Sequence, residues 1–188
     1  METAPFADSS HGFPSAILPD EEPIDVMIWN VQQDGNFAAE MMTHLTCMRR
    51  TDGISVKNFL LDIRAGTTSA QSIARLVRAR IRLVLISSYF IHALVNEQLT
   101  IDASDAVVTE SSKINSAERY RMIPTLVRPV SKKAYEQDPL FGKLQCLPRD
   151  GRPIQAWRNH DEAWADVVNE LRRVLLELGR VKPPKRSW

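Results

Sequence analysis

The sequence predicts an α/β domain built on a five-stranded parallel sheet, with the flavodoxin-like strand order 2-1-3-4-5 and helices on both faces. Residues 81–88 form an unbroken branched-aliphatic run after Arg82 and end in two serines, which is typical of a strand covered on both faces. Helical patterns lie on both sides of this run, and strand-like and helix-like segments alternate along the chain. We therefore expect residues 81–87 to form the central strand.

Length and composition favour one domain with terminal extensions. The chain has 188 residues, and a hydrophobic content of 44% is enough for a packed core. We expect a flexible arm over residues 1–23, a folded domain over residues 24–179 and a flexible tail over residues 180–188. Cys47 and Cys146 are widely spaced, so we expect neither a disulfide framework nor a zinc site.

The charge balance points to no particular partner. The 24 basic and 23 acidic residues nearly cancel, and there is no long block of like charge, so we expect no direct nucleic-acid contact and no membrane binding. The start of the sequence has neither the basic nor the apolar part of a signal peptide. We therefore expect a cytoplasmic protein.

The first part of the domain has the pattern strand, helix, strand. Residues 24–29 are mostly apolar and follow a proline, as at the start of a strand. From Asn36 onward, apolar residues recur at helical spacing until residues 52–53 end the helix. Residues 54–56 are expected to form a short second strand, and residues 57–68 a loop.

The middle of the domain supplies the third and fourth strands. A helix over residues 69–78 leads into the central strand, and residues 91–101 are compatible with another helix after it. Residues 102–119 are polar and serine-rich, and we assign no element to them. Residues 121–127 form the fourth strand. Pro124 lies inside that strand and has no N–H, so the strand belongs near a sheet edge or a bulge.

The C-terminal part supplies the last strand and the last helix. Residues 153–156 are expected to make a small fifth strand. An apolar stripe between Ala163 and Leu178 indicates a helix that ends at Gly179. Because this topology alone gives no function, the chemistry must be sought beyond the carboxyl ends of the strands.

Five segments carry a family pattern. They are residues 24–28, Asp34 with Phe37-Ala38, Asp62-Ile63-Arg64-Ala65-Gly66, Ile123-Pro124-Thr125-Leu126-Val127-Arg128-Pro129, and the segment from Leu147-Pro148-Arg149-Asp150-Gly151-Arg152-Pro153-Ile154 to Trp164. Together and in this order they resemble the Toll/interleukin-1 receptor (TIR) domain of bacterial proteins, from its first strand through its BB loop to its C-terminal segment. Two places depart from the family: Trp29-Asn30-Val31 replaces a small polar turn, and residues 91–94 replace a Ser-Asp-Tyr-like turn.

The resemblance implies an enzyme that splits the nicotinamide–ribose bond of NAD, as a glycohydrolase or an ADP-ribose cyclase, in antiphage defence or cell-suicide signalling. NAD is then the substrate, and no separate cofactor or metal is implied. The alternative is a catalytically inactive TIR adaptor that acts by self-assembly or by binding a partner. Under both readings the expected partners are other TIR domains, in a homo-oligomer that forms on activation.

Glu97 is the expected catalytic residue, because it is the first carboxylate after the third strand. The resemblance implies that a carboxylate here stabilises the oxocarbenium-like centre that develops on the ribose, by analogy with glycoside hydrolysis. An ordinary exposed helix glutamate is the plain alternative. Asp102 lies further along and is a weaker substitute.

Four further residues are expected at the same crevice, beyond the first and third strands: Trp29, Asn30, Ser87 and Ser88. Trp29 either stacks on a base or on nicotinamide, or fills the pocket as a bulky plug. The two serines either bind ribose hydroxyls or cap the following helix.

The loop containing Asp62, Arg64 and Gly66 has no nucleophile. The resemblance implies that this loop contacts another TIR domain or gates the pocket. Gly66 suits such a loop because glycine adopts backbone angles that other residues resist.

Overall fold

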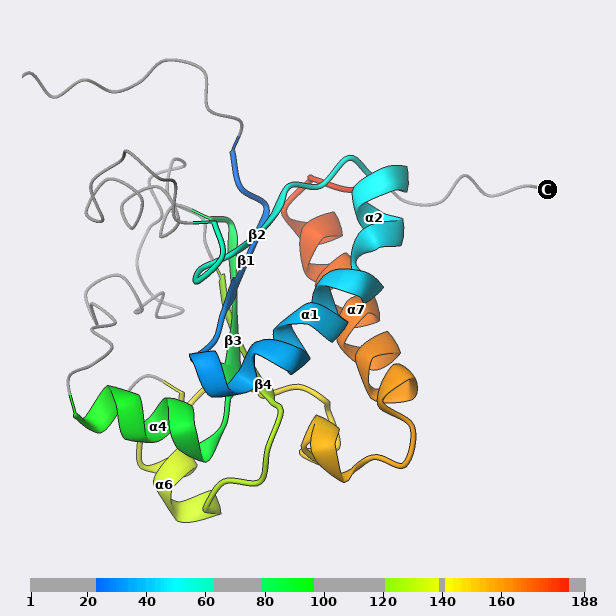
Figure 1. Ribbon diagram of the computed structural model, residues 1–188. Coiled ribbons are helices and arrows are strands. Elements are labelled where there is room, and N and C mark those ends of the chain that lie inside the picture. Colours follow the sequence, from blue (N-terminus) through cyan, green and yellow to red (C-terminus); the bar gives the residue numbers. More distant parts are fainter. Residues whose placement is uncertain (1–22, 63–78, 97–120, 139–140, 183–188) are drawn as a thin grey trace, which may run out of the picture.

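The computed structural model of the chain describes residues 23–62, 79–96, 121–138 and 141–182. Its strands form a four-stranded sheet in the order β2-β1-β3-β4, and every pair is parallel (Figure 1). The strands are β1 (Val26–Trp29), β2 (Val56–Asn58), β3 (Ile81–Ile86) and β4 (Arg121–Leu126). The described part is therefore an α/β fold with a parallel sheet, as predicted. Residues 1–22 of the predicted arm lie outside it.

β3 is one of the two inner strands of this sheet, which agrees with the inner position expected for residues 81–87. The described residues form four strands, so the predicted five-stranded sheet is not confirmed. β3 pairs with β1 on one side, with Ile81 opposite Val26, and with β4 on the other, with Ile81 opposite Arg121. All six of its residues are buried. Because both faces of the strand are covered, its sequence is aliphatic apart from Arg82, which is buried as well, and it does not alternate with polar residues.

The fifth strand predicted over residues 153–156 is wrong. Ile154–Ala156 forms a short 3-10 helix, η2. Ile154 is fully buried in the core, which explains its apolar character without a strand. Pro153 before it has no N–H to donate to a ladder, so the segment is poorly suited to sheet pairing.

Leu147 occupies the outer edge of β4 at a single position. It forms an isolated parallel bridge with Thr125: its N–H donates to the Pro124 carbonyl at 2.8 Å, and its carbonyl accepts from the Leu126 N–H at 2.7 Å. Pro148 follows at once and cannot donate the next bond. The Pro124 carbonyl points toward Leu147 and away from β3. In a strand the nitrogen and the carbonyl of one residue point to the same side, so the Pro124 nitrogen also faces away from β3. There the missing N–H costs no bond to β3, as expected for a strand near a sheet edge.

Three helices cover one face of the sheet, namely α1 (Gly35–His44), α2 (Thr46–Thr51) and α7 (His160–Glu177) (Figure 1). The single helix predicted from Asn36 is divided at Leu45. Nearby, the hydroxyls of Thr43 and Thr46 each donate to the carbonyl four residues earlier, a bond that tends to bend helices.

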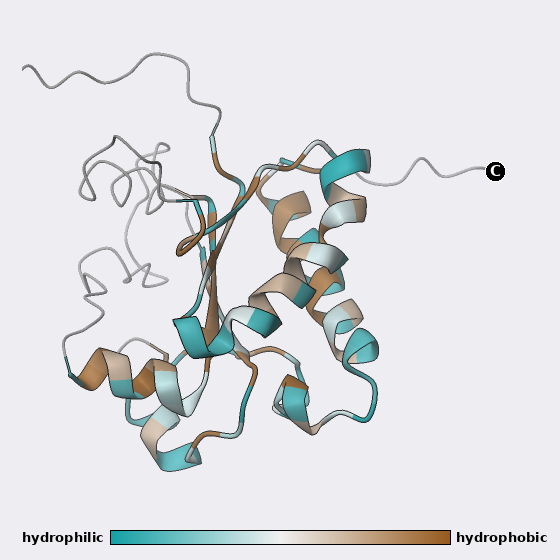
Figure 2. Ribbon diagram, in the orientation of Figure 1, coloured by the Kyte–Doolittle hydropathy of each residue, from teal (hydrophilic) through white to brown (hydrophobic). Residues whose placement is uncertain are grey.

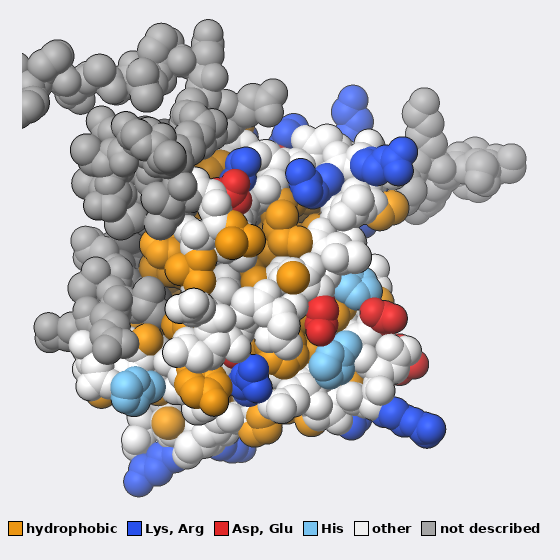
Figure 3. All heavy atoms as spheres, viewed as in Figure 1, with side chains coloured by type: hydrophobic (Ala, Val, Ile, Leu, Met, Phe, Trp, Pro, Cys, Tyr) orange, Lys and Arg blue, Asp and Glu red, His pale blue; other side chains and the backbone are white. Residues whose placement is uncertain are grey.

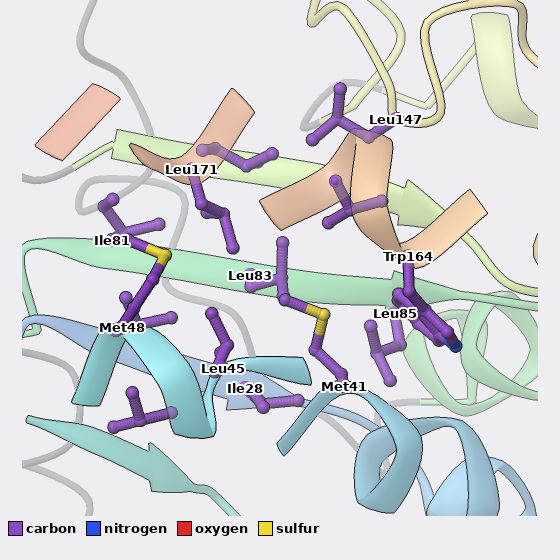
Figure 4. Packing of buried hydrophobic residues seen from close by; sticks show 14 of the residues in the cluster. Ile28, Met41, Leu45, Met48, Ile81, Leu83, Leu85, Leu147, Trp164 and Leu171 are labelled. Atoms are coloured by element: carbon purple, nitrogen blue, oxygen red, sulfur yellow. The ribbon is translucent and has the colours of Figure 1, made fainter. Parts of the chain in front are cut away.

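The core between these helices and the sheet is apolar. Figure 4 shows Leu83 and Leu85 of β3 packed among side chains that include Met41 of α1 and Trp164 of α7. The indole N–H of Trp164 donates to Glu40 Oε2 at 2.7 Å, so this large side chain is buried without losing its hydrogen bond. Along α7, hydrophobic residues alternate with hydrophilic ones, as in a helix with one buried side (Figure 2).

The opposite face of the sheet packs against α4 (Ser88–Val95) and the region of α6 (Lys132–Glu136). Phe90 of α4 and Phe141 are fully buried there, with ring centroids 6.1 Å apart. The helix predicted from residue 91 therefore begins three residues earlier, and its part beyond residue 96 lies outside the described residues, as does the helix predicted over residues 69–78. No helix in the described ranges is long and apolar enough to cross a membrane.

A buried carboxylate closes the amino edge of the sheet. Asp25 accepts hydrogen bonds from the Ser55 N–H at 2.8 Å and from Arg180 Nε at 2.7 Å, and Arg80 lies 3.5 Å away. Val181 is buried as well. Arg180 and Val181, which the sequence assigned to the tail, are therefore packed against the domain.

The burial of β3 predicts a large cost for truncating its side chains. Leu83→Ala should lower the free energy of unfolding by about 2–5 kcal/mol, because it leaves a cavity between β3 and the helices. Leu61→Ala is the matched control at an exposed position and should change stability by less than about 0.5 kcal/mol. Urea titrations followed by circular dichroism would measure both, and equal costs would contradict the described core.

Candidate functional site

The candidate site lies at the carboxyl edge of the sheet, between β1 and β3. These strands are neighbours, but β2 lies beyond β1 on one side and β4 beyond β3 on the other. In doubly wound sheets, ligands bind beyond the strand ends at such a switch point. The residues at or just after the ends of the four strands here are Asn30, Asn58, Ser87 and Arg128.

Asp34 is the buried carboxylate of this edge. It ends the short 3-10 helix η1 (Gln32–Asp34) and has no exposed surface. The Ser87 hydroxyl donates to its Oδ2 at 2.5 Å, and Arg128 Nε donates to its Oδ1 at 2.8 Å. Burying a carboxylate is costly unless each oxygen is partnered in this way. Asp34 thus joins the segment after β1 to the ends of β3 and β4.

Arg128 is held on several sides. Besides its bond to Asp34, its Nη2 donates to the Gln33 carbonyl at 3.2 Å. Its guanidinium lies 5.1 Å from the ring centroid of Phe37 and 5.6 Å from that of Tyr89, within the range of cation–π attraction. The side chain is one quarter exposed. Arg128 therefore lies at the carboxyl edge with fixed partners while staying in contact with solvent.

The sequence prediction treated Asp34 and Arg128 only as parts of the family pattern and did not assign them to the site. One signal could have found them. Each follows a predicted strand closely, and the carboxyl ends of parallel strands meet at one edge of a sheet. An acidic and a basic residue in those two places form a natural ion pair.

Ser87 and Ser88 have different environments. Ser87 is buried and is the N-cap of α4, since its Oγ accepts from the Phe90 N–H at 3.1 Å while donating to Asp34. Of the two roles left open by the sequence, the structure shows capping. Ser88 is exposed at the start of the helix.

Trp29 and Asn30 lie inside the protein and not on the rim. Trp29 is 4% exposed and packs on Phe59, with ring centroids 5.2 Å apart, and its indole N–H has no hydrogen-bond partner among the described residues. The Asn30 side chain donates to the Val31 carbonyl at 2.9 Å and accepts from Asn58 Nδ2 at 3.0 Å. The arrangement of Trp29 is that of the bulky plug.

Asn58 and Asp62 organise the loop after β2. The Asn58 side-chain oxygen accepts from the N–H groups of Leu60 and Leu61 at 2.9 and 3.2 Å. Asp62 in turn accepts from the Asn58 N–H at 2.6 Å and from Lys57 Nζ at 3.3 Å. Asp62, predicted as part of an assembly loop, therefore holds the preceding turn in shape, and the turn displays Leu61 with 81% of its surface exposed.

The remaining predicted residues are Glu97, Asp102, Arg64 and Gly66, and all four lie outside the described residues. α4 ends at Val95, two positions before Glu97. The catalytic role of Glu97 and the assembly role of Arg64 and Gly66 stay predictions.

The described residues contain no cluster of three or more His, Cys, Asp or Glu side chains that could hold a metal ion. Neither Cys47 nor Cys146 is in a disulfide. Burial raises the pKa of the Cys146 thiol, which makes this thiol a weak nucleophile at neutral pH. Burial also raises the pKa of the neighbouring Tyr135 phenol, which therefore stays protonated. The polar groups of the carboxyl edge thus remain the best candidates for a site.

Comparison with known proteins does not assign the chain to a family. No family model matches it. A segment of 73 residues, 37% of the chain, is 34% identical to the uncharacterized protein y4lF of Sinorhizobium fredii. The matched segment spans 23% of that protein, less than a quarter of its length.

The two serines offer a direct test of the network at this edge. Ser87→Ala should lower the free energy of unfolding by about 1–2 kcal/mol, because it removes the helix cap and one donor to Asp34. Ser88→Ala, one residue later and exposed, should change it by less than about 0.5 kcal/mol. Chemical unfolding of both variants would measure the difference, and a Ser88 variant as unstable as the Ser87 variant would argue against the network.

Proposed function

We propose that this chain is a TIR domain of the bacterial type that consumes NAD, as a glycohydrolase or ADP-ribose cyclase, in antiphage defence or cell-suicide signalling. The observation that supports the proposal best is that two of the family-like segments contact each other at the carboxyl edge of the sheet. Asp34 and Arg128 come from two of those segments, and they form an ion pair at the carboxyl edge beside the switch point. We also infer the full strand order 2-1-3-4-5, with the Leu147 bridge in the fifth position.

The proposed reaction breaks the bond between the nicotinamide nitrogen and the ribose. Nicotinamide leaves with the bonding electron pair and becomes neutral, because its nitrogen is already positively charged in NAD. No strong general acid is therefore needed. The positive charge that develops on the ribose is stabilised by the Glu97 carboxylate, and then water or a group of the same molecule attacks the ribose carbon.

The buried state of Trp29 and Asn30 bears on how NAD would enter. Both side chains are at most 4% exposed, and Phe59 and Asn58 from the β2 side cover them. A ligand that contacts either side chain must displace some of these neighbours. The proposal therefore expects low turnover by the monomer and faster turnover once the chain assembles with other TIR domains into a homo-oligomer.

Glu97→Gln tests the proposed chemistry, because it keeps the size of the side chain and removes its charge. Nicotinamide release from NAD should fall about 10²–10³-fold, while the circular dichroism spectrum and the melting temperature stay close to those of the wild type. The rate is measured by chromatography of the products, on the protein alone and under crowding that promotes assembly. Asp102→Asn tests the weaker candidate in the same assay.

Glu136→Gln is the matched control, since Glu136 is an exposed glutamate on α6. It should leave nicotinamide release unchanged. A wild type without NAD turnover, even when assembled, would refute the enzyme proposal. A Glu97 variant as active as the wild type would refute the role of Glu97.

The second candidate function is an inactive adaptor, and the turn after β2 favours it. Leu61 is exposed on a turn that Asn58 and Asp62 hold in place. Binding through Leu61 would therefore not require the backbone of this turn to lose further conformational entropy. Hydrophobic side chains also gather over β1 and β2 on the face seen in Figure 3. An adaptor of this kind would act through contact of that loop with a second TIR domain.

Leu61→Ser tests the contact. If the turn mediates assembly, the variant should weaken self-association at least about tenfold, because it removes an apolar anchor, with a melting temperature within a few degrees of the wild type. Val95→Ser is the control at another exposed apolar position, 75% exposed on α4. Analytical ultracentrifugation measures both, and unchanged association of the Leu61 variant would exclude this surface.

A further inference from the structure

We propose that Arg128 is a positioning residue for the candidate site at the carboxyl edge, acting through Asp34 and Ser87 to fix the first turn of α4. The consequence for turnover rests on the proposed function. The consequence for α4 rests only on the contacts among the described residues, so the two can be tested separately.

Three successive bonds connect Arg128 to the helix. Arg128 Nε donates to Asp34 Oδ1, and Asp34 Oδ2 accepts the Ser87 hydroxyl proton. Because that proton is committed to Asp34, the Ser87 oxygen presents its lone pairs to the Phe90 N–H, 3.1 Å away. By holding the Asp34 carboxylate in place, Arg128 supports the direction in which Ser87 accepts, and with it the cap of α4.

The guanidinium is suited to this task by its shape. It donates from Nε and Nη2 at the same time, to Asp34 and to the Gln33 carbonyl, while its plane lies near the rings of Phe37 and Tyr89. Lysine has a single charged nitrogen and no planar fork, so it cannot reproduce both bonds and the two ring contacts. The site should therefore distinguish arginine from lysine.

The position of α4 is what matters for the crevice. The helix starts directly after the central strand and has eight residues, and Glu97 follows its last residue by two positions. A first turn that is free to fray would leave the direction of this helix less well defined. Arg128 would then affect turnover without touching the reacting atoms.

The experiment compares Arg128→Gln and Arg128→Lys with Arg121→Gln. Arg121 begins the same strand at its other end and makes an exposed ion pair with Glu177, so it is a matched control. Hydrogen exchange of the backbone amides, read by NMR, reports on the Phe90 N–H and on the rest of α4 without any substrate.

We expect the Phe90 amide to exchange at least about tenfold faster in Arg128→Gln, relative to the amides of β3, because the capping bond loses the charged partner of Asp34 that supports it. Arg128→Lys should lie between this variant and the wild type, and Arg121→Gln should match the wild type. Nicotinamide release should fall mainly in kcat, with little change in KM. An unchanged Phe90 exchange rate in Arg128→Gln, or a lysine variant equal to the wild type, would overturn the proposal.

A double variant tests the route through Asp34 and guards against loss of the fold. Asp34→Asn removes the buried charge, so Arg128→Gln in that background leaves no unpaired carboxylate behind. If Arg128 acts through Asp34, adding Arg128→Gln to Asp34→Asn should change the Phe90 exchange rate by less than about twofold. An undiminished effect would show that Arg128 acts on α4 by another path and would overturn the proposal. A wild type without NAD turnover would refute the enzyme function and leave this exchange test unaffected.

Discussion

Two buried carboxylates, one near each end of β1, set conditions that the rest of the chain must meet. Asp25 at the amino edge pairs with Arg180, which lies 155 positions later in the sequence. Asp34 at the carboxyl edge pairs with Arg128, which lies 94 positions later. A carboxylate without such partners would be costly to bury. Burial of each carboxylate therefore depends on a residue distant in sequence, namely Arg128 after β4 for Asp34 and Arg180 after α7 for Asp25.

The central part of the fold could be predicted because its pattern has one physical solution. An aliphatic run such as residues 83–86 of β3 fits a strand buried on both faces, and the stripe of α7 fits a helix with one buried side. The fifth strand failed because a short apolar segment with a proline fits a buried 3-10 turn equally well. Ile154 is buried in either case. The segment is a turn because the N–H groups of Ala156 and Trp157 donate to carbonyls three residues earlier, while Leu147 makes the bridge to β4.

At the candidate site, the sequence located the strand ends but could not give the state of the side chains there. Ser87 was placed correctly after β3, yet its commitment to Asp34 and to the α4 cap depends on a segment from another strand end. For Trp29, the sequence did not distinguish a ring that stacks on a ligand from a ring that fills the interior. The structure packs it against Phe59, which follows β2. Such choices depend on neighbours distant in sequence, which local patterns do not record.

The bond between Arg180 and Asp25 brings the beginning and the end of the packed part to one edge of the sheet. A unit whose two ends lie side by side can be inserted into a loop of a larger protein, or joined to flanking domains, without rearranging its strands. Here that edge is the amino edge, and the candidate site lies at the opposite one. The two ends of the packed part lie together at the amino edge, which is the arrangement that domain insertion requires. The polar residues at the strand ends lie at the opposite edge, away from both ends.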